Sequence, residues 1–167
     1  MRMTMTHPTS TSRTTLEAIS PGGSTCTVQV TDGWEVVAEP GIGVPWVALP
    51  AETDSGFRAN LVLTVSDVDS DLEEWQRSAE TLLEETLHSY RAIDLAWEVL
   101  AGTRALRRLA HHVVDGQGVT LEQWSVLGDR TGWTISGTAA DSEYAGLAAP
   151  FGEVASSLRI VAAGASR

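Results

Sequence analysis

Residues 90–139, YRAIDLAWEVLAGTRALRRLAHHVVDGQGVTLEQWSVLGDRTGWTISGTA, decide the fold. Hydrophobic and polar residues alternate along four runs, as they do in half-buried strands. These runs are 90–100, 104–114, 118–127 and 131–139. Short glycine-bearing turns separate the last three runs, and connections of that length join only antiparallel neighbours. The block therefore predicts an antiparallel sheet.

Upstream of this block the alternation recurs in shorter runs. The expected strands there are 26–30, 34–36, 44–49 and 59–65. Pro45 and Pro50 leave the third of these runs short of backbone donors, because proline has no amide hydrogen. We therefore place that run at an edge of the sheet.

Between the two groups of strands the spacing of apolar residues becomes helical. Residues 71–87 are expected to form a helix, and Ser70 with Glu73 forms a capping box at its start. Its apolar side chains recur every three or four residues, and such a stripe is expected to pack on an apolar surface. We therefore expect this helix to cover the apolar side of the 90–139 sheet.

A second amphipathic helix is expected after the sheet block. Its apolar stripe runs from Tyr144 to Leu158, and Pro150 fits its first turn, where a missing amide donor costs nothing. The order β–β–β–β–α–β–β–β–β–α lacks the regular strand–helix alternation of parallel sheets. The sequence thus predicts an α+β fold, with an antiparallel sheet of about six to eight strands covered by two main helices.

Composition narrows the class of partner. The chain has 167 residues, 43% of them hydrophobic, and a net charge of −11. Phosphate backbones and anionic lipid would repel so acidic a protein, so we expect no nucleic-acid or membrane-surface partner. The single cysteine, Cys26, excludes an internal disulfide. Without an apolar signal segment or a run long enough to span a bilayer, a cytoplasmic location is expected.

The predicted domain organisation is simple. Residues 1–23 are rich in Thr and Ser and are expected to form a mobile tail. Residues 24–162 are expected to form one domain, and 163–167 a short C-terminal tail.

Several segments together are similar to the Mog1/PsbP-like fold family. They are Asp32-Gly33-Trp34, the run 57–63, the helix start at 71–74, Gly102 and Ala105 in the long hairpin, Phe151, and the ending 156–160. The family includes actinobacterial LpqN/LpqT-type proteins and related bacterial uncharacterised-domain proteins. Its members bind a small GTPase, serve as photosystem subunits, or act as chaperone-like adaptors of secreted effectors. The resemblance therefore implies a binding scaffold without a shared catalytic residue set.

The residues themselves indicate no catalytic, metal or cofactor site. The Asp-x-Asp-x-Asp pattern at 67–71 begins like a calcium loop, but the sixth and twelfth positions hold Leu72 and Ser78 rather than Gly and Glu. His111 and His112 are neighbours on an expected strand and would point to opposite faces, so they cannot bind one ion together. We expect no cofactor and no metal.

A hypothetical binding surface can still be assembled from aromatic and basic residues. Its candidate members are Trp46, Trp124, Arg107, Arg108 and His112. The arginines are also open to a plainer interpretation, namely cross-strand pairing with glutamates such as Glu98 or Glu122. Three further tryptophans are expected to lie in the core: Trp75, Trp97 and Trp133.

The leading hypothesis is therefore a non-enzymatic binding or adaptor domain that recognises a protein or peptide through its sheet surface. A second hypothesis is a chaperone of the secretion-adaptor type, which would hold an apolar ligand or a hydrophobic helix. A hydrolase that uses His111 or His112 is the least supported. The sequence identifies neither the partner nor the oligomeric state.

Overall fold

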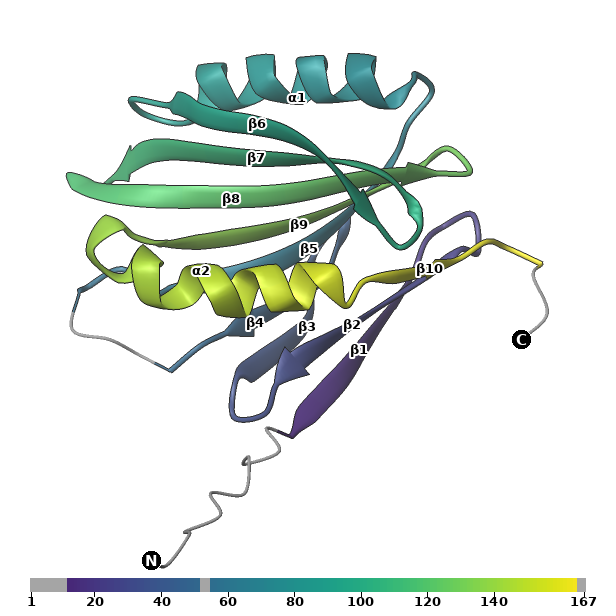
Figure 1. Cartoon of the computed structure of the whole chain (residues 1–167), viewed down its shortest axis with the longest axis horizontal. Coiled ribbons are helices and arrows are strands. Elements are labelled where there is room, and N and C mark those ends of the chain that lie inside the picture. Colours follow the sequence, from purple (N-terminus) through teal and green to yellow (C-terminus); the bar gives the residue numbers. More distant parts are fainter. Residues whose placement is uncertain (1–11, 52–54, 165–167) are drawn as a thin grey trace, which may run out of the picture.

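The structure is a computed structural model that describes residues 12–51 and 55–164. These residues form an α+β fold, as expected, with two helices and two antiparallel sheets (Figure 1). The elements, in chain order, are β1 (Arg13–Ile19), β2 (Thr25–Thr31), β3 (Glu35–Gly41), β4 (Val44–Leu49), β5 (Asn60–Asp67), α1 (Leu72–Thr86), β6 (Arg91–Leu100), β7 (Thr103–Val114), β8 (Gln117–Gly128), β9 (Thr131–Ala140), α2 (Asp141–Ser156) and β10 (Arg159–Val161).

The larger sheet has seven strands in the order β3-β4-β5-β9-β8-β7-β6. Strands β6 to β9 pair with their sequence neighbours in antiparallel register, which confirms the prediction for residues 90–139. β9 also pairs with β5, and this pairing joins the two halves of the sheet.

The smaller sheet corrects the prediction of a long N-terminal tail. Residues 13–19 form β1, which pairs with β2 along its whole length, and β10 pairs with the other side of β2. The Thr-rich composition of β1 suggested disorder, but threonine is β-branched and suits a strand. Ala18 of β1 is buried in the core, so the folded unit begins at about this strand. Residues 1–11 and 165–167 of the predicted tails lie outside the described residues.

One face of the seven-stranded sheet carries the hydrophobic core. Trp133, Ile135 and Val126 are buried on this face. Phe151 of α2 packs against them, and the buried side chains of β2 belong to the same cluster. The cover over the apolar face is therefore α2 together with the small sheet (Figure 1).

Helix α1 lies on the opposite face, which corrects the expectation that it covers the apolar one. The surface beneath α1 is mostly polar, and its strand residues around one cavity are Thr64, Ser66, Arg108, Gln123, Ser125 and Thr134. Trp75 of α1 contacts this face at Gly132. Only Gln76 of α1 is fully buried, so the helix rests on the sheet without a large apolar contact.

The helix boundaries differ from the predictions in two details. Asp71 rather than Ser70 is the N-cap of α1, and its side chain accepts a hydrogen bond from the Glu74 amide over 2.9 Å. Pro150 lies inside α2 rather than in its first turn, because α2 begins at Asp141. The first turn of α2 therefore lies before the predicted apolar stripe, which begins at Tyr144, and Pro150 falls in the middle of the helix.

Close approach between α2 and β9 generates a prediction. A Cβ atom added at Gly137 would lie 2.5 Å from the Phe151 ring, so Gly137→Ala should displace α2 and destabilise the protein by about 1–3 kcal/mol. Gly146→Ala is the matched control, because a Cβ there meets nothing within 4 Å and alanine favours a helix. Urea unfolding should show a lower midpoint for Gly137→Ala and an unchanged or higher one for Gly146→Ala. Equal midpoints would contradict the described packing.

Candidate functional site

Strand β6 presents a row of exposed hydrophobic side chains. Leu95, Trp97 and Val99 lie on the α1 face of the sheet, because their partners on β7 are Arg108, Leu106 and Arg104. Together with Ile93 they are between 46% and 74% exposed. Trp97 was expected in the core, and its exposure corrects that prediction. We call Leu95, Trp97 and Val99 the β6 stripe.

The stripe is exposed because of where β6 lies. β6 is the last strand in the order of the seven-stranded sheet, so in the described part of the chain it forms one edge. Among the strands, α1 packs mainly against β8, which lies further into the sheet. The stripe therefore lacks the second layer that normally covers an apolar strand face.

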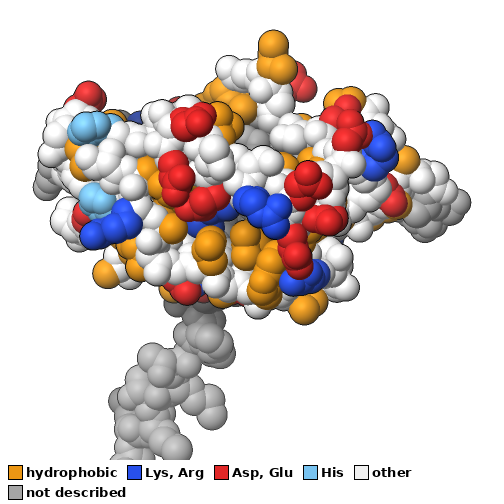
Figure 2. Space-filling model, turned by 90° about the horizontal axis from the view of Figure 1, so that it is seen from above, with side chains coloured by type: hydrophobic (Ala, Val, Ile, Leu, Met, Phe, Trp, Pro, Cys, Tyr) orange, Lys and Arg blue, Asp and Glu red, His pale blue; other side chains and the backbone are white. Residues whose placement is uncertain are grey.

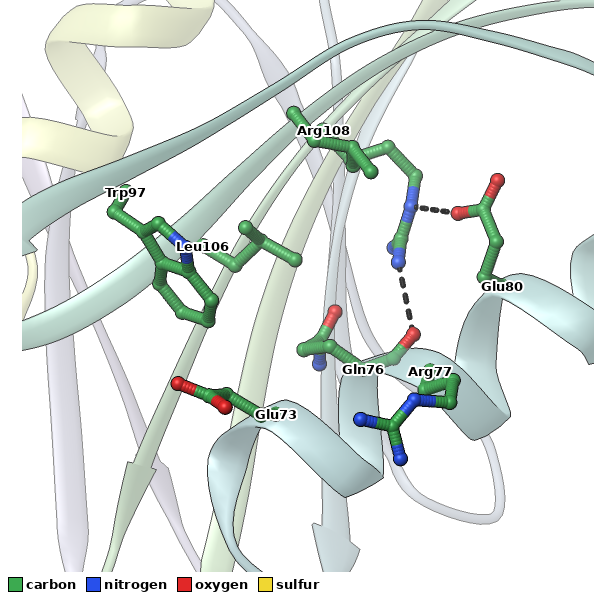
Figure 3. Close-up of a pocket in the computed structure, with 8 residues that line it drawn as sticks. Glu73, Gln76, Arg77, Glu80, Trp97, Leu106 and Arg108 are labelled. Carbon is green, nitrogen blue, oxygen red and sulfur yellow. Dashed lines mark hydrogen bonds and ion pairs between the residues drawn. The ribbon is translucent and has the colours of Figure 1, made fainter.

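A cavity of about 430 Å³ separates α1 from the β6–β7 hairpin. It is lined by Glu73, Gln76, Arg77, Glu80, Leu95, Trp97, Leu106 and Arg108. Figure 3 shows Trp97 and Leu106 on the sheet side of this cavity and the helix residues opposite them. The cavity thus has an apolar wall from β6 and β7 and a polar wall from α1.

Arg108 connects the two walls. Its side chain is 2% exposed, and its Nε donates to Glu80 Oε2 over 2.6 Å. Nη2 donates to the Gln76 carbonyl over 3.2 Å (Figure 3), and Nη1 donates to Gln123 Oε1 over 2.9 Å. A buried charge is costly unless it is paired and hydrogen-bonded, and this guanidinium is both.

Glu80 is held from a second side. The Tyr90 hydroxyl donates to Glu80 Oε1 over 3.0 Å. Burial and the adjacent carboxylate raise the pKa of Tyr90 above its ordinary value, so the phenol stays protonated as a donor. Both oxygens of Glu80 are therefore occupied within the protein.

The outer rim of the site is mainly acidic. α1 contains five glutamates and a single arginine, Arg77. Arg104 lies 3.7 Å from the centre of the Trp97 ring and pairs with Glu73 at 2.8 Å. Figure 2 looks down on this side and shows acidic and arginine side chains with hydrophobic ones beside them. The site thus combines an apolar strip with a negatively charged helix.

The structure does not bring the five predicted binding residues together. Trp46 and Trp124 are buried in the core on the face that α2 covers, so neither can act as an exposed anchor. Both side chains lie on the apolar face of the sheet, and α2 packs over that face. This corrects the predicted surface.

Arg107 and Arg108 lie on opposite faces, as neighbours on a strand must. Arg107 Nε donates to the buried Glu122 over 2.6 Å, and Asp94 lies 3.3 Å away. The Tyr144 hydroxyl donates to the other Glu122 oxygen over 2.6 Å. Cross-strand pairing with Glu122, the plainer interpretation, is confirmed for Arg107.

His112 is buried on the α1 side, and its Nδ1 has no hydrogen-bond partner among the described residues. Burial lowers its pKa below the ordinary value of 6.5, and His111 adds to this effect. His111 lies on the other face with its Nε2 3.0 Å from Asp141 Oδ2. The two imidazoles do not converge on one point, as predicted from their positions on a strand.

The described residues also contain no cluster of typical metal ligands. Within residues 12–51 and 55–164, no group of three or more His, Cys, Asp or Glu side chains could hold a metal ion. Neither described helix is long and apolar enough to cross a membrane.

Two parts of the candidate site, β6 and Gln76, were not predicted from the sequence. The alternation in residues 90–100 predicted a strand, but the edge position of that strand depends on the order of strands in space. Gln76 had no signal, because a glutamine inside a helix is usually solvated.

The shifted pKa of His112 generates a prediction about pH. Because the folded pKa lies below the unfolded value of 6.5, the unfolded state binds more protons as the pH falls through that value. The free energy of unfolding should therefore decrease between pH 7.5 and pH 5, and by less in His112→Gln. His88→Gln changes an exposed histidine and serves as the control. Urea unfolding at both pH values gives the comparison, and identical losses in all three proteins would contradict the assignment.

Comparisons with known proteins agree on the fold. Neither protein-family models nor curated proteins match the sequence. The structure is similar to that of LpqN, involved in cell envelope biogenesis of Mycobacterium tuberculosis, with a TM-score of 0.71 and 17% identity over 89% of this chain and 91% of that one. It is also similar to the cyanobacterial PsbP of Synechocystis sp. PCC 6803, with a TM-score of 0.64 and 16% identity over 94% of this chain and 98% of that one.

A third similar structure is a Pseudomonas aeruginosa protein of unknown function. Its TM-score is 0.61, with 9% identity over 85% of this chain and 94% of that one. At these identities the comparisons show the fold alone, and they agree with the segments that resemble the family in the sequence. The chain therefore has the Mog1/PsbP-like fold.

Proposed function

We propose that this protein is a non-enzymatic binding domain that recognises an amphipathic segment of a protein partner through the β6 stripe. The observation that carries the proposal is the row of large hydrophobic side chains on an edge strand, 46% to 74% exposed beside a cavity. Contiguous exposed apolar surface in a monomer often marks an interaction site. Scattered exposed hydrophobics would carry no such meaning.

The negative charge of α1 and of the whole chain favours a partner whose polar side carries Lys or Arg. Glu73 and Glu80 of α1 line the groove, α1 contains three further glutamates, and the whole chain has a net charge of −11. A segment with Lys or Arg on one face and apolar residues on the other would match both features. Complementary charge of this kind chiefly raises the association rate and selects the partner.

The structural neighbours support a binding role in general terms. LpqN is involved in cell envelope biogenesis, and the second neighbour is a cyanobacterial PsbP. Unrelated functions share one scaffold, so function has to be argued from the site itself. The cytoplasmic location stays a prediction.

The stripe also favours a second candidate, a chaperone for a hydrophobic helix. A chaperone of this type would need apolar surface but no acidic rim. The two candidates therefore differ in salt dependence, because screening weakens exposed charge pairs and leaves apolar contacts largely intact.

A hydrolase remains the least supported candidate. His111 is paired with Asp141, and the Thr120 hydroxyl donates to the second oxygen of that carboxylate over 2.7 Å. These groups lie on the α2 face of the sheet, away from the cavity between α1 and β6. We therefore propose no reaction for them.

Binding of designed amphipathic peptides tests the proposal. A helical peptide with Leu on one face and Lys on the other should bind, and its counterpart with Glu in place of Lys should bind at least about tenfold more weakly. Val99→Asp should weaken binding of the Lys peptide by about tenfold, because it places a charge on the stripe. Isothermal titration calorimetry at low salt gives these dissociation constants.

Ile42→Asp is the matched control, because Ile42 is an exposed isoleucine in the turn between β3 and β4. Binding unaffected by Val99→Asp, or weakened equally by Ile42→Asp, would refute the proposed surface. Equal binding of the Lys and Glu peptides at low and high salt would favour the hydrophobic-helix candidate instead.

A further inference from the structure

The cavity between α1 and the β6–β7 hairpin contains an unsatisfied polar group. Gln76 is 4% exposed, and its Oε1 is buried with no hydrogen-bond partner among the described residues. Leaving a buried acceptor unpaired is unfavourable, and native proteins leave few such groups. Figure 3 shows the Gln76 side chain between the Trp97–Leu106 wall and the Arg108 guanidinium. A ligand in the cavity could therefore supply the missing partner.

Of the charged residues that line the cavity, Arg108, Glu80 and Glu73 are paired within the protein, and Arg77 is exposed to solvent on α1. Arg108 is paired with Glu80, whose other oxygen accepts from Tyr90. Glu73 is paired with Arg104 on the rim. A charged ligand would have to compete with these pairs, whereas a neutral ligand would leave them intact.

The walls favour a flat apolar body. Trp97, Leu95 and Leu106 form the sheet side of the cavity. Aromatic rings pack well against indole and leucine side chains, and pockets for small molecules combine such walls with few polar groups. The volume of about 430 Å³ lies within the range of such pockets.

The polar part of the ligand follows from the chemistry of the glutamine amide. Its oxygen accepts and its nitrogen donates, and a half-turn of the amide exchanges the two positions. A ligand amide offers both a donor and an acceptor and can pair with Gln76 in either orientation. A carboxylate offers acceptors only.

We propose that this cavity binds a small neutral aromatic carboxamide, whose ring packs against Trp97 and Leu106 and whose amide pairs with the side chain of Gln76. This site goes beyond the docking surface proposed above. Val99 does not line the cavity, and Gln76 is not part of the β6 stripe, so the two proposals can fail separately.

The test uses benzamide as the probe and benzoate as its charged counterpart. In ¹H–¹⁵N spectra of the full chain, benzamide should shift the Trp97 indole signal and the Gln76 side-chain amide in a saturable manner. Benzoate should bind at least tenfold more weakly. Gln76→Met keeps the length of the side chain but removes the amide, and it should weaken benzamide binding at least tenfold.

Two controls separate a binding role from a structural one. Gln76→Met should keep or raise the melting temperature, because it removes an unpaired buried group. Ser78→Ala changes an exposed position of α1 and should leave benzamide binding unchanged. Val99→Asp should leave benzamide binding unchanged as well.

The proposal is overturned if benzamide shifts no cavity signal up to its solubility limit. It is equally overturned if benzoate binds as well as benzamide, or if Gln76→Met binds benzamide like the wild type.

Discussion

A single buried guanidinium determines how the two layers of this protein meet. Arg108 projects from β7 into the interface beneath α1, where it is 2% exposed and donates hydrogen bonds to Glu80, Gln123 and the Gln76 carbonyl. The sheet surface under α1 is lined by Ser, Thr and Gln, and so offers the helix little apolar area. Hydrogen bonds to charged groups are stronger than neutral ones, and here they replace a hydrophobic interface.

This arrangement explains why a groove exists. On the other face, α2 and the small sheet fill the space above the tryptophans and leucines with apolar side chains. On the α1 face, the long Arg108 side chain holds the helix over the sheet, and a cavity of about 430 Å³ lies beside it. The uncovered β6 stripe borders the same cavity. One face of the sheet thus carries the packed core, and the other carries the cavity and the exposed β6 stripe.

Local patterns predicted the parts of the fold that depend on neighbouring residues. Short turns gave the antiparallel order of β6 to β9, and the alternation of β7 separated Arg107 from Arg108. The face that α1 occupies was predicted wrongly, because the stripe containing Trp75 was assumed to need an apolar surface. Trp97 was placed in the core because strand order, which exposes β6, is a property of the whole sheet. The orphaned Gln76 amide could only be seen once α1 was placed.

The most direct test of this account is hydrogen exchange of the α1 amides in Arg108→Met. The substitution removes the guanidinium but keeps an apolar side chain of similar length, and Tyr90 still donates to Glu80. If Arg108 holds the helix on the sheet, the α1 amides should exchange at least about tenfold faster while those of β8 and β9 keep their protection. Arg104→Met, which removes an exposed pair with Glu73, should change neither. Unchanged protection of α1 in Arg108→Met would show that apolar contacts such as Trp75 hold the helix instead.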